Sequence, residues 1–407
     1  MGLVVQKFGG SSVASIDRIK NVANKVIAER ERGSQVVVVV SAMGDTTDDL
    51  IELARQTGPR LSEREMDQLL TTGEQQSAAL LALTLNNMGY KAQSLCGWQA
   101  GIRTDAVHAK ARITSIDPVR IQQALDRDEV VVVAGFQGLS PNGEVTTLGR
   151  GGSDTTAVAL AASIKADICD IYTDVAGVYT ADPRIAKDAR KLDYISYDEM
   201  LELASLGAVV LQPRAVEFAM LYDVCVQVRS SFLNDPGTRV MGVEKMEKER
   251  IVSGVAHDLN VAKIALFDVP DQPGIARTIF KRLAEQSINV DMIIQAAMRD
   301  DRNDIAFTIE RNDLAKALPV VEDIIEIIGA EGMAFGEDVA KISVVGAGMK
   351  SNPGVAAAVF EALAEEEINI QMISTSEIKV SCIIDAVNIQ KAVLALHKKF
   401  RLDELEG

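Results

Sequence analysis

The sequence predicts an α/β protein in which a mostly parallel sheet, with helices on both faces, precedes two copies of a smaller α+β domain. Up to about residue 230, β-branched runs alternate with amphipathic helical stretches, which is the pattern of parallel strands joined by helices. Beyond that point the chain repeats itself after about 80 residues, a period that fits a duplicated small domain better than a solenoid. The 407 residues also suffice for two or three domains.

The first part of the chain contains a series of short apolar runs that we interpret as strands. The strand candidates are Leu3–Phe8, Val36–Ser41, Lys91–Leu95, Val130–Gly135, Ile168–Thr173 and Val224–Val228. Between the first two, apolar residues at helical spacing predict a helix with Ser15 as its N-cap. Ser62, followed by Glu65, predicts a capping box at the start of the next helix. Parallel sheets bind ligands beyond the carboxyl ends of their strands, so we expect the site in those loops.

The repeat in the last third of the chain is visible residue by residue. The sequence VAKI opens both copies, at 261–264 and at 339–342. From 273 to 293, 11 of 21 residues recur 80 positions later, which predicts two copies of one fold. Each copy reads as strand, Pro-Gly turn, helix, strand, and then a further strand and helix. The charged stretch Glu244–Arg250 fits a linker before the repeats and equally a solvated helix end.

The composition excludes several classes of protein. With 42 basic and 58 acidic residues the net charge is −16, which argues against a dedicated nucleic-acid-binding protein. The four cysteines are far apart and the chain has three histidines, so we expect buried thiols rather than a disulfide framework or a zinc site. The apolar runs are too short to cross a bilayer. We therefore expect a cytoplasmic protein without a nucleic-acid or membrane partner.

The segment KFGGSS at 7–12 follows the first predicted strand and is the first candidate for chemistry. Gly9 and Gly10 permit a sharp turn and a close approach of backbone to ligand, and the following amides suit a phosphate group. Lys7 adds a positive charge for an anionic oxygen. A plain turn between strand and helix explains two glycines equally well.

The polar run at 146–156 is the second candidate. A glycine pair again precedes a predicted helix, with Arg150 before the pair and Asp154 in the first helical turn. An arginine binds a carboxylate through two parallel hydrogen bonds, and Asp154 can order cationic groups around a phosphate. The alternative is that Asp154 only complements the helix dipole. The density of polar residues after an apolar strand favours a functional role.

Further polar residues follow the fifth and second predicted strands. Thr173 and Asp174 end a strand and precede Tyr179 and Arg184, a combination that suits a nucleotide base and its phosphates. The loop after the second strand has hydroxyl residues, and Glu74 closes a helical turn, where it either accepts an ammonium group or caps the helix. The chain lacks a Walker A sequence and a Ser-His-Asp pattern. This set of residues suits phosphoryl transfer, where positioning and charge neutralisation do the catalysis.

These motifs resemble, in order, those of the bacterial aspartate kinases of the amino-acid kinase family. The matching segments are KFGGSS at 7–12, VSAM at 40–43, TGE at 72–74, LGRGGSD at 148–154, TD at 173–174 and ISTSEI at 373–378. The two repeats resemble the paired ACT domains of those enzymes, so the resemblance covers the whole chain. It implies an amino-acid kinase αβα sandwich at 1–245, a linker and ferredoxin-like ACT domain at 246–336, and a second ACT domain at 337–407.

The resemblance implies that ATP, with Mg²⁺, phosphorylates the side-chain carboxylate of L-aspartate to 4-phospho-L-aspartate in lysine, threonine and methionine biosynthesis. Lys7 is implied to neutralise the transferring phosphoryl group, and Asp154 to organise that lysine. The implied substrate-binding residues are Ser41, Thr47, Glu74 and Arg150, of which Glu74 takes the ammonium group and Arg150 the α-carboxylate. The implied ATP-binding residues are Lys7, Gly9, Gly10, Ser11, Thr173, Asp174, Tyr179 and Arg184.

Two positions depart from the family pattern. Ala176 stands where relatives have a second aspartate in the turn after Asp174, and Val209 stands where they commonly have a lysine that contacts ATP. The loss of a lysine near phosphate removes a favourable charge. We therefore expect weaker ATP binding with the chemistry retained.

The resemblance to paired ACT domains also implies feedback control by lysine, threonine or both, and a homodimer or higher oligomer. The implied effector-binding residues are Asp271, Gly274, Ala276, Asp291 and Gln295 in the first copy, and Asn369 and Ile370 in the second. Asp271 and Asp291 either bind an effector amine or cap a turn or helix. In the family, the strand before the first copy, here Ile251–Ala256, often joins the sheet of the second ACT domain.

Two alternatives to an aspartate kinase remain at this point. One is another amino-acid kinase, such as an N-acetylglutamate or glutamate kinase, although Glu74 with Arg150 favours a free amino acid and the repeats favour aspartate. The other is a non-catalytic amino-acid sensor that has degenerated at Ala176 and Val209. Intact Lys7, Arg150 and Asp154 argue against the sensor.

Overall fold

The structure, a computed structural model, describes residues 2–206, 210–242, 251–296, 301–349 and 352–404. The chain divides into two compact units. The first unit consists of the described residues up to Val178, of residues 191–205, and of the described residues between 209 and 247. The second unit contains residues 179–190 and the described residues from 251 onward. The proposed boundary at 245, the linker candidate Glu244–Arg250 and Val209 lie outside the described residues.

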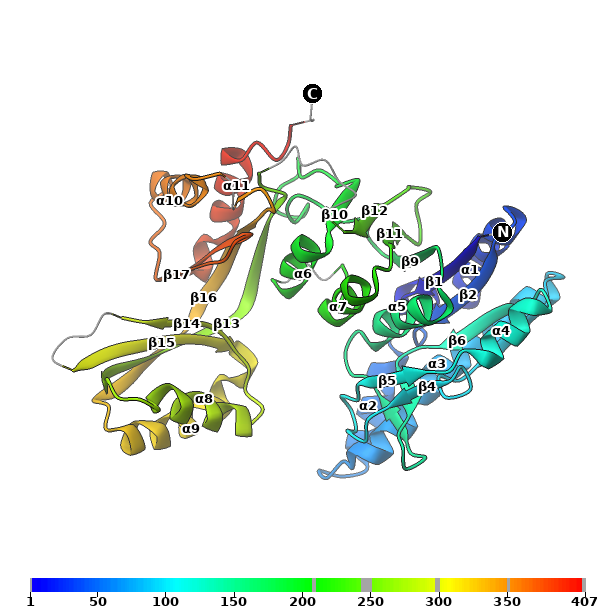
Figure 1. The fold of residues 1–407 in the computed structure, drawn as a ribbon, viewed down its shortest axis with the longest axis horizontal. Helices are drawn as coiled ribbons and strands as arrows, with labels where there is room; N and C mark the ends of the chain where they lie inside the picture. The colour runs from blue at the N-terminus through cyan, green and yellow to red at the C-terminus, as the bar shows by residue number, and fades with distance from the viewer. Residues whose placement is uncertain (1, 207–209, 243–250, 297–300, 350–351, 405–407) are drawn as a thin grey trace. The chain divides into compact units, whose positions relative to one another are not determined.

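An eight-stranded sheet forms the centre of the first unit, in the order β10-β12-β11-β9-β1-β2-β6-β3 (Figure 1). Its neighbouring strands are parallel except for the antiparallel pair β11 and β12. The predicted mostly parallel sheet is therefore confirmed. The strands are β1 (Leu3–Phe8), β2 (Gln35–Val40), β3 (Ala92–Leu95), β6 (Val130–Ala134), β9 (Ile168–Thr173), β10 (Tyr194–Ser196), β11 (Val226–Ser230) and β12 (Thr238–Met241).

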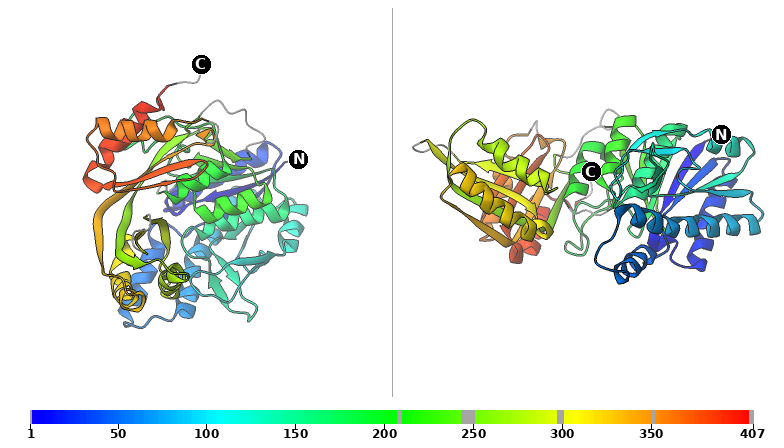
Figure 2. Two further views of the ribbon diagram at one scale, coloured as in Figure 1. Left: turned by 60° about the vertical axis from the view of Figure 1, so that its left-hand side comes forward. Right: turned by 90° about the horizontal axis from the view of Figure 1, so that it is seen from below.

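Helices cover both faces of this sheet (Figure 2). Val36 and Val38 of β2 belong to a hydrophobic cluster with α1 and α3, whereas α5 contacts β1, β2 and β9 outside that cluster. Successive strand residues point to opposite faces, which explains why β2 is buried almost throughout. The helices are α1 (Ile16–Glu31), α2 (Thr46–Gln56), α3 (Glu63–Asn87), α4 (Val119–Asp126), α5 (Gly152–Ile164), α6 (Tyr197–Ser205) and α7 (Pro213–Tyr222).

A smaller four-stranded sheet, in the order β5-β4-β7-β8, also belongs to the first unit. Its strands are β4 (Ile102–Thr104), β5 (Ile113–Ile116), β7 (Gln137–Leu139) and β8 (Val145–Thr147). Strand β8 contacts α3 and leads directly to the polar run before α5. Its strands are only three or four residues long, too short to give a strand pattern in the sequence, and the sheet was therefore not predicted.

The second unit is one six-stranded sheet in the order β14-β15-β13-β16-β18-β17. Its long central strands β13 (Gly254–Pro270) and β16 (Gly332–Val345) run antiparallel and pass through both copies of the repeat. The other strands are β14 (Val290–Gln295), β15 (Arg302–Glu310), β17 (Met372–Thr375) and β18 (Lys379–Asp385). The helices are α8 (Ile275–Glu285), α9 (Leu314–Ile328), α10 (Val355–Glu365) and α11 (Ile389–Lys399), and each pair packs on its own hydrophobic cluster.

The predicted duplication is confirmed down to single backbone angles. Gly274 and Gly354 precede α8 and α10 with φ of 101° and 106°, a conformation that favours glycine. After these helices, Ser287 and Glu367 both adopt a positive φ, of 55° and 56°. The strand before the first copy begins at Gly254, later than expected, and its first residues pair with the second-copy half of β16.

The capping prediction holds for one helix and is wrong for the other. The Ser15 side chain accepts a hydrogen bond from the Arg18 amide at the start of α1. Ser62 precedes α3, but its side chain makes no capping hydrogen bond. Glu65 pairs with the neighbouring Arg64 instead of reaching back to the helix start. The sequence pattern of a capping box does not include this competing partner.

Replacement of Ser15 by alanine is expected to lower the free energy of unfolding of the first unit by about 1 kcal/mol, because a helix-end amide loses its partner. The measurement is urea unfolding of the full chain followed by tryptophan fluorescence, since Trp98, the one tryptophan, lies in the first unit. Ser62→Ala is the matched control and should change the value by less than about 0.5 kcal/mol. Equal losses in both variants would contradict the assignment.

Candidate active site

Backbone hydrogen bonds gather the loops that follow four strands of the large sheet. The Ser41 amide donates to the Phe8 carbonyl at 3.1 Å, and the Gly9 amide donates to the Tyr172 carbonyl at 3.3 Å. The Gly135 amide donates to the Val40 carbonyl at 3.0 Å. The loops after β1, β2, β6 and β9 therefore meet at the carboxyl edge of the sheet, where parallel sheets bind ligands.

Lys7 and Asp154 form a buried ion pair at this edge. The Lys7 Nζ lies 2.5 Å from the Asp154 Oδ1, and both side chains are about one tenth exposed. Lys7 is near the end of β1, and Asp154 is in the first turn of α5. Each charge would be costly to bury alone, so the pair holds the ammonium group in place. This contact is the one that the implied organising role of Asp154 requires.

Gly10 lets the loop after β1 pack closely against the loop after β2, whereas a Cβ at Gly9 would meet its neighbours only at ordinary contact distance. A Cβ at Gly10 would lie 3.0 Å from the Ala42 carbonyl oxygen and 3.2 Å from that of Gly44. The Gly10 carbonyl also accepts a hydrogen bond from the Gly44 amide at 3.1 Å. Residues Gly10–Ser12 then form a single 3₁₀ turn before α1, and Ser11 is exposed. The structure thus explains Gly10 by its packing against the loop after β2, and phosphate binding by this loop stays a prediction.

Glu74 is a buried carboxylate with one oxygen unoccupied. It lies in the middle of α3, so the expectation that it closes or caps a helical turn is wrong. A Cβ at the preceding Gly73 would lie 2.8 Å from the Ala42 Cβ, so glycine there lets α3 approach the loop after β2. The Glu74 Oε1 accepts from the Ala42 amide at 3.1 Å, while Oε2 has no partner among the described residues. Burial raises the pKa of Glu74 to about 7.

Arg150 is exposed and lies four residues before Asp154 in the chain. It stands between Gly149 and Gly151, whose φ angles of 77° and 69° favour glycine. A Cβ at Gly151 would overlap the Gln212 side chain. Within the described parts of the chain, no hydrogen bond or ion pair occupies Arg150, so its charge is available to an anion.

The other predicted site residues of the first unit lie at or after the ends of strands that terminate at the same edge of the sheet. Ser41 follows β2, and Thr47 is in the first turn of α2; both are partly exposed. The Thr173 hydroxyl donates to the Asp174 carboxylate at 3.0 Å, and the Thr173 carbonyl accepts from the Ser231 amide at 2.8 Å. The loop after β11 therefore joins the four loops described above.

Tyr179 and Arg184 belong to the second compact unit. The Arg184 guanidinium binds the Asp182 carboxylate through several hydrogen bonds, the shortest of 2.7 Å, and this contact lowers the pKa of Asp182. Ala181 and Ala186, on either side of Arg184, pack into the hydrophobic cluster of the second ACT copy. The segment that contains the predicted nucleotide-binding residues Tyr179 and Arg184 therefore packs on the hydrophobic core of the second unit.

Sequence reasoning missed several residues that shape this edge. Phe136, the second residue after β6 and with a φ of 69°, contacts Gly152, and its amide donates to the Thr156 hydroxyl at 3.1 Å. Asp67 lies seven residues before Glu74 on α3 and is fully buried. An available signal was position: a polar or aromatic residue after a buried strand, and an acid at helical spacing from Glu74.

The described residues hold no group of three or more His, Cys, Asp or Glu side chains suited to a metal ion. Asp154, in the first turn of α5, is already paired with Lys7. Mg²⁺ usually binds proteins through one or two carboxylates and otherwise through substrate phosphates and water. The residues therefore fit a magnesium ion that arrives with the nucleotide. Among the described helices, none is long and apolar enough to cross a membrane.

A separate cavity of about 390 Å³ lies at the start of α8 in the second unit. It includes four predicted effector residues, Asp271, Gly274, Ala276 and Gln295. Asn303, which the sequence analysis missed, also lines it; its amide donates to the Asp271 carboxylate at 3.4 Å, and its own carbonyl oxygen has no partner among the described residues.

The other predicted effector residues lie outside the lining of this cavity. Asp291 pairs with Lys341 of the second copy at 2.5 Å, and Gln371, its counterpart 80 positions on, binds Lys263 of the first copy at 2.6 Å. Asn369 is exposed, and Ile370 packs against the hydrophobic cluster of the second copy. Because its carboxylate is paired with Lys341, Asp291 is not available to a ligand in the cavity.

Comparison with known families accounts for the whole architecture. The model of the amino acid kinase family matches residues 2–230, and models of the ACT domain match residues 263–328 and 342–400. These matches define a kinase unit followed by two ACT domains, as the motifs and the repeat had indicated.

The individual relatives of the chain are aspartokinases. The chain is 54% identical to an aspartokinase of Geobacillus stearothermophilus and 53% identical to one of Bacillus sp. (strain MGA3), in each case over 99% of this chain and 98% of the relative. Escherichia coli aspartokinase III, solved with aspartate and ADP, is 25% identical with a TM-score of 0.84 and covers 98% of this chain and 100% of its own. The chain belongs to the aspartokinases of the amino acid kinase family.

The carboxyl group of Glu74 is expected to titrate near pH 7, because burial penalises its charged form. The measurement is ¹³C NMR of carboxyl-labelled glutamates in the full chain between pH 5.5 and 8.5, with Glu74→Gln to assign the signal. Glu129 is the control, since a hydrogen bond from Arg127 lowers its pKa and it should stay ionised throughout. A titration near pH 7 that persists in the Gln variant would refute the assignment.

Proposed function

We propose that the carboxyl edge of the large sheet binds Mg²⁺·ATP and L-aspartate and transfers the γ-phosphoryl group to the aspartate side chain. The products are 4-phospho-L-aspartate and ADP. The observation that carries the proposal is the unoccupied oxygen of buried Glu74 at the same edge as the Lys7–Asp154 pair. The chain is thus an aspartate kinase, in line with its relatives at 53% and 54% identity.

Glu74 and Arg150 supply the two charges that recognise a free α-amino acid. The unoccupied Oε2 of Glu74 accepts the substrate ammonium group, which also favours the ionised carboxylate at neutral pH. The unoccupied guanidinium of Arg150 binds the α-carboxylate through two parallel hydrogen bonds. Ser41, directly after β2, and Thr47, in the first turn of α2, are the further residues that we assign to the substrate. An N-acetylated substrate lacks the ammonium charge, which argues against an N-acetylglutamate kinase.

Lys7 neutralises the charge that spreads over the transferring phosphoryl group. Asp154 keeps the Lys7 ammonium group in position, and the amides of Gly10 and Ser11 bind phosphate oxygens. The Gly9 amide, to which the sequence assigns the same role, already donates to the Tyr172 carbonyl. The acceptor carboxylate is ionised at neutral pH and already nucleophilic, so the reaction needs no general base. Mg²⁺, bound with the nucleotide, supplies further charge neutralisation.

The nucleotide also contacts Thr173 and Asp174, and the nucleotide-binding roles of Tyr179 and Arg184 stay predictions from the sequence. Arg184 is paired with Asp182, so it must exchange this partner for a phosphate or ribose oxygen. The expected weakening of ATP binding at Val209 stays a prediction, which Val209→Lys tests through the KM for ATP.

The cavity at the start of α8 is the proposed effector site. Gly274 precedes the helix, whose free amides suit a carboxylate, while Asp271 suits an amine. Gln295 and Asn303 add amide groups for further polar atoms of the effector. We take lysine, threonine or both as effectors; E. coli aspartokinase III, 26% identical with a TM-score of 0.77, was solved with lysine and aspartate. Pairing of ACT domains in a homodimer and a cytoplasmic location stay predictions from the sequence.

Lys7→Met is expected to lower kcat about 10²- to 10³-fold, because the transferring phosphoryl group loses its charge stabilisation. The measurement is ADP release from Mg²⁺·ATP with L-aspartate, N-acetylglutamate or glutamate as acceptor. Lys20→Met is the control: Lys20 is 60% exposed on α1 and pairs only with Asp17 among the described residues. Turnover without preference for aspartate, or equal loss in the two variants, would contradict the proposed reaction.

Gln295→Ala is expected to raise the effector concentration for half-inhibition about tenfold, because a hydrogen bond to a charged effector group is lost. The assay titrates lysine, threonine and their mixture against the aspartate reaction. Thr375→Ala changes the equivalent position of the second copy and should leave the inhibition curve unchanged. Inhibition that responds to Thr375→Ala and not to Gln295→Ala would place the effector in the other copy.

A further inference from the structure

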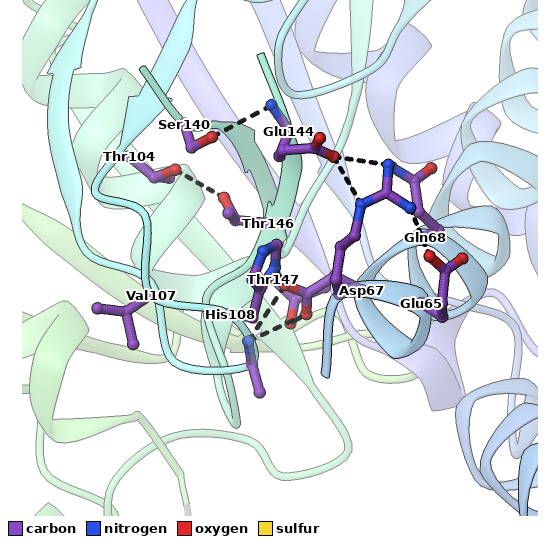
Figure 3. Close-up of polar contacts among 12 residues, drawn as sticks. Glu65, Asp67, Gln68, Thr104, Val107, His108, Ser140, Glu144, Thr146 and Thr147 are labelled. Atoms are coloured by element: carbon purple, nitrogen blue, oxygen red, sulfur yellow. Dashed lines mark hydrogen bonds and ion pairs between the residues drawn. The ribbon is translucent and has the colours of Figure 1, made fainter. Parts of the chain in front are cut away.

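Asp67 is the centre of a buried polar cluster that the reaction described above does not use. Its carboxyl group is completely buried and accepts the Thr147 hydroxyl at 2.5 Å. The Ala109 amide lies 3.1 Å and 3.2 Å from its two oxygens, and the His108 Nδ1 lies 2.6 Å from Oδ2 (Figure 3). Both oxygens are thus fully engaged, which is what allows a carboxyl group to be buried.

These hydrogen bonds join three segments that are distant in sequence. Asp67 is on α3, Thr147 is the last residue of β8, and His108 and Ala109 belong to the loop between β4 and β5. Arg214 of α7 strengthens the junction: its guanidinium donates to the Leu148 carbonyl at 2.7 Å and to the Ala111 carbonyl at 3.1 Å. The backbone before Gly149 is therefore held on two sides.

This junction lies immediately before the Arg150 loop. Thr147 is three residues from Arg150, and a Cβ at Gly149 would lie 3.0 Å from the Ala109 carbonyl oxygen. Asp67 is also seven residues before Glu74, two turns along the same side of α3, or about 10 Å at the helical rise. A single helix therefore carries Glu74 and also anchors the loop that carries Arg150.

We propose that Asp67 is a positioning residue for aspartate: it fixes the Arg150 loop relative to Glu74 and so sets the spacing of the two charges that grip the substrate. It contacts no substrate itself. Loss of the Asp67 contacts lets the Arg150 loop shift while the phosphate loop, anchored through Lys7 and Asp154, stays in place. The proposal rests on the role of Arg150 given under the proposed function.

The adjacent residue of β8 provides a matched control. Thr146 and Thr147 are consecutive in the strand and so point to opposite faces of the small sheet. The buried Thr146 hydroxyl bonds the Thr104 hydroxyl at 2.6 Å, so this pair supports the same strand from its other side without reaching α3 (Figure 3). A purely structural role predicts similar effects for both contacts, whereas positioning predicts an effect of the Asp67 contact alone.

The test compares Asp67→Asn, Thr147→Val, Thr104→Val, Arg150→Ala and the double variant Asp67→Asn/Arg150→Ala in the full chain. The readouts are the KM for L-aspartate at saturating Mg²⁺·ATP and the KM for ATP at saturating aspartate. Asp67→Asn should raise the KM for aspartate about 10- to 100-fold and leave that for ATP within about twofold. Thr147→Val, which keeps the carboxyl group, should cause a smaller rise in the same direction, and Thr104→Val should change neither constant.

The double variant decides whether Asp67 acts through Arg150. If it does, the double variant has the same KM for aspartate as Arg150→Ala, because a displaced loop matters only while it carries the guanidinium. Additive effects, or parallel rises in both KM values, would overturn the positioning role; should Asp67→Asn fail to fold, Thr147→Val decides by the same criteria. If Arg150→Ala leaves the KM for aspartate unchanged, the assignment of Arg150 fails as well, which is distinguishable from failure of Asp67 alone.

Discussion

The ion pair between Lys7 and Asp154 is the contact on which the arrangement of the site depends. It joins the central strand of the sheet to the first turn of α5, and neither charge is favourable at this depth without the other. The pair also defines one end of the Arg150 loop, since Asp154 lies four residues beyond Arg150. The other end is fixed by Asp67 and Arg214 through hydrogen bonds to β8 and its extension. The loop is therefore held at both ends while its guanidinium stays exposed.

Close approach of backbone segments is the second constraint. Gly10 and Gly73 both face the loop after β2, one from the phosphate loop and one from α3, and a Cβ at either would press on Ala42 or Gly44. The Ala42 amide can then reach Glu74, and this leaves the second carboxylate oxygen for a ligand. Glycine at these positions thus matters for proximity alone, whereas at Gly149 and Gly151 both proximity and a positive φ favour glycine.

The second unit shows how a duplicated fold becomes one continuous structure. The long strands β13 and β16 belong to both copies, and Lys263 and Lys341 each reach across to the other copy. The contacts are reciprocal in position but differ in chemistry, because Asp291 has Gln371 as its counterpart. The cavity side has also diverged, with Gln295 in one copy and Thr375 in the other. The two copies therefore differ both in the contacts between them and in the residues at the cavity.

The sequence by itself determined the parallel sheet, the duplication and the polar segments at the strand ends, because buried strands, repeated residues and glycine turns are local patterns. The tertiary structure decided which side chains are occupied. Asp291 and Arg184 have partners, whereas Glu74 retains a free oxygen and a raised pKa in the middle of a helix that sequence reasoning ended too early. The only local signal of Asp67 is its helical spacing from Glu74, and that spacing does not reveal its partners. Its role arises from a loop about 40 residues away and a strand about 80 residues away, and only folding brings those donors to a buried carboxyl group.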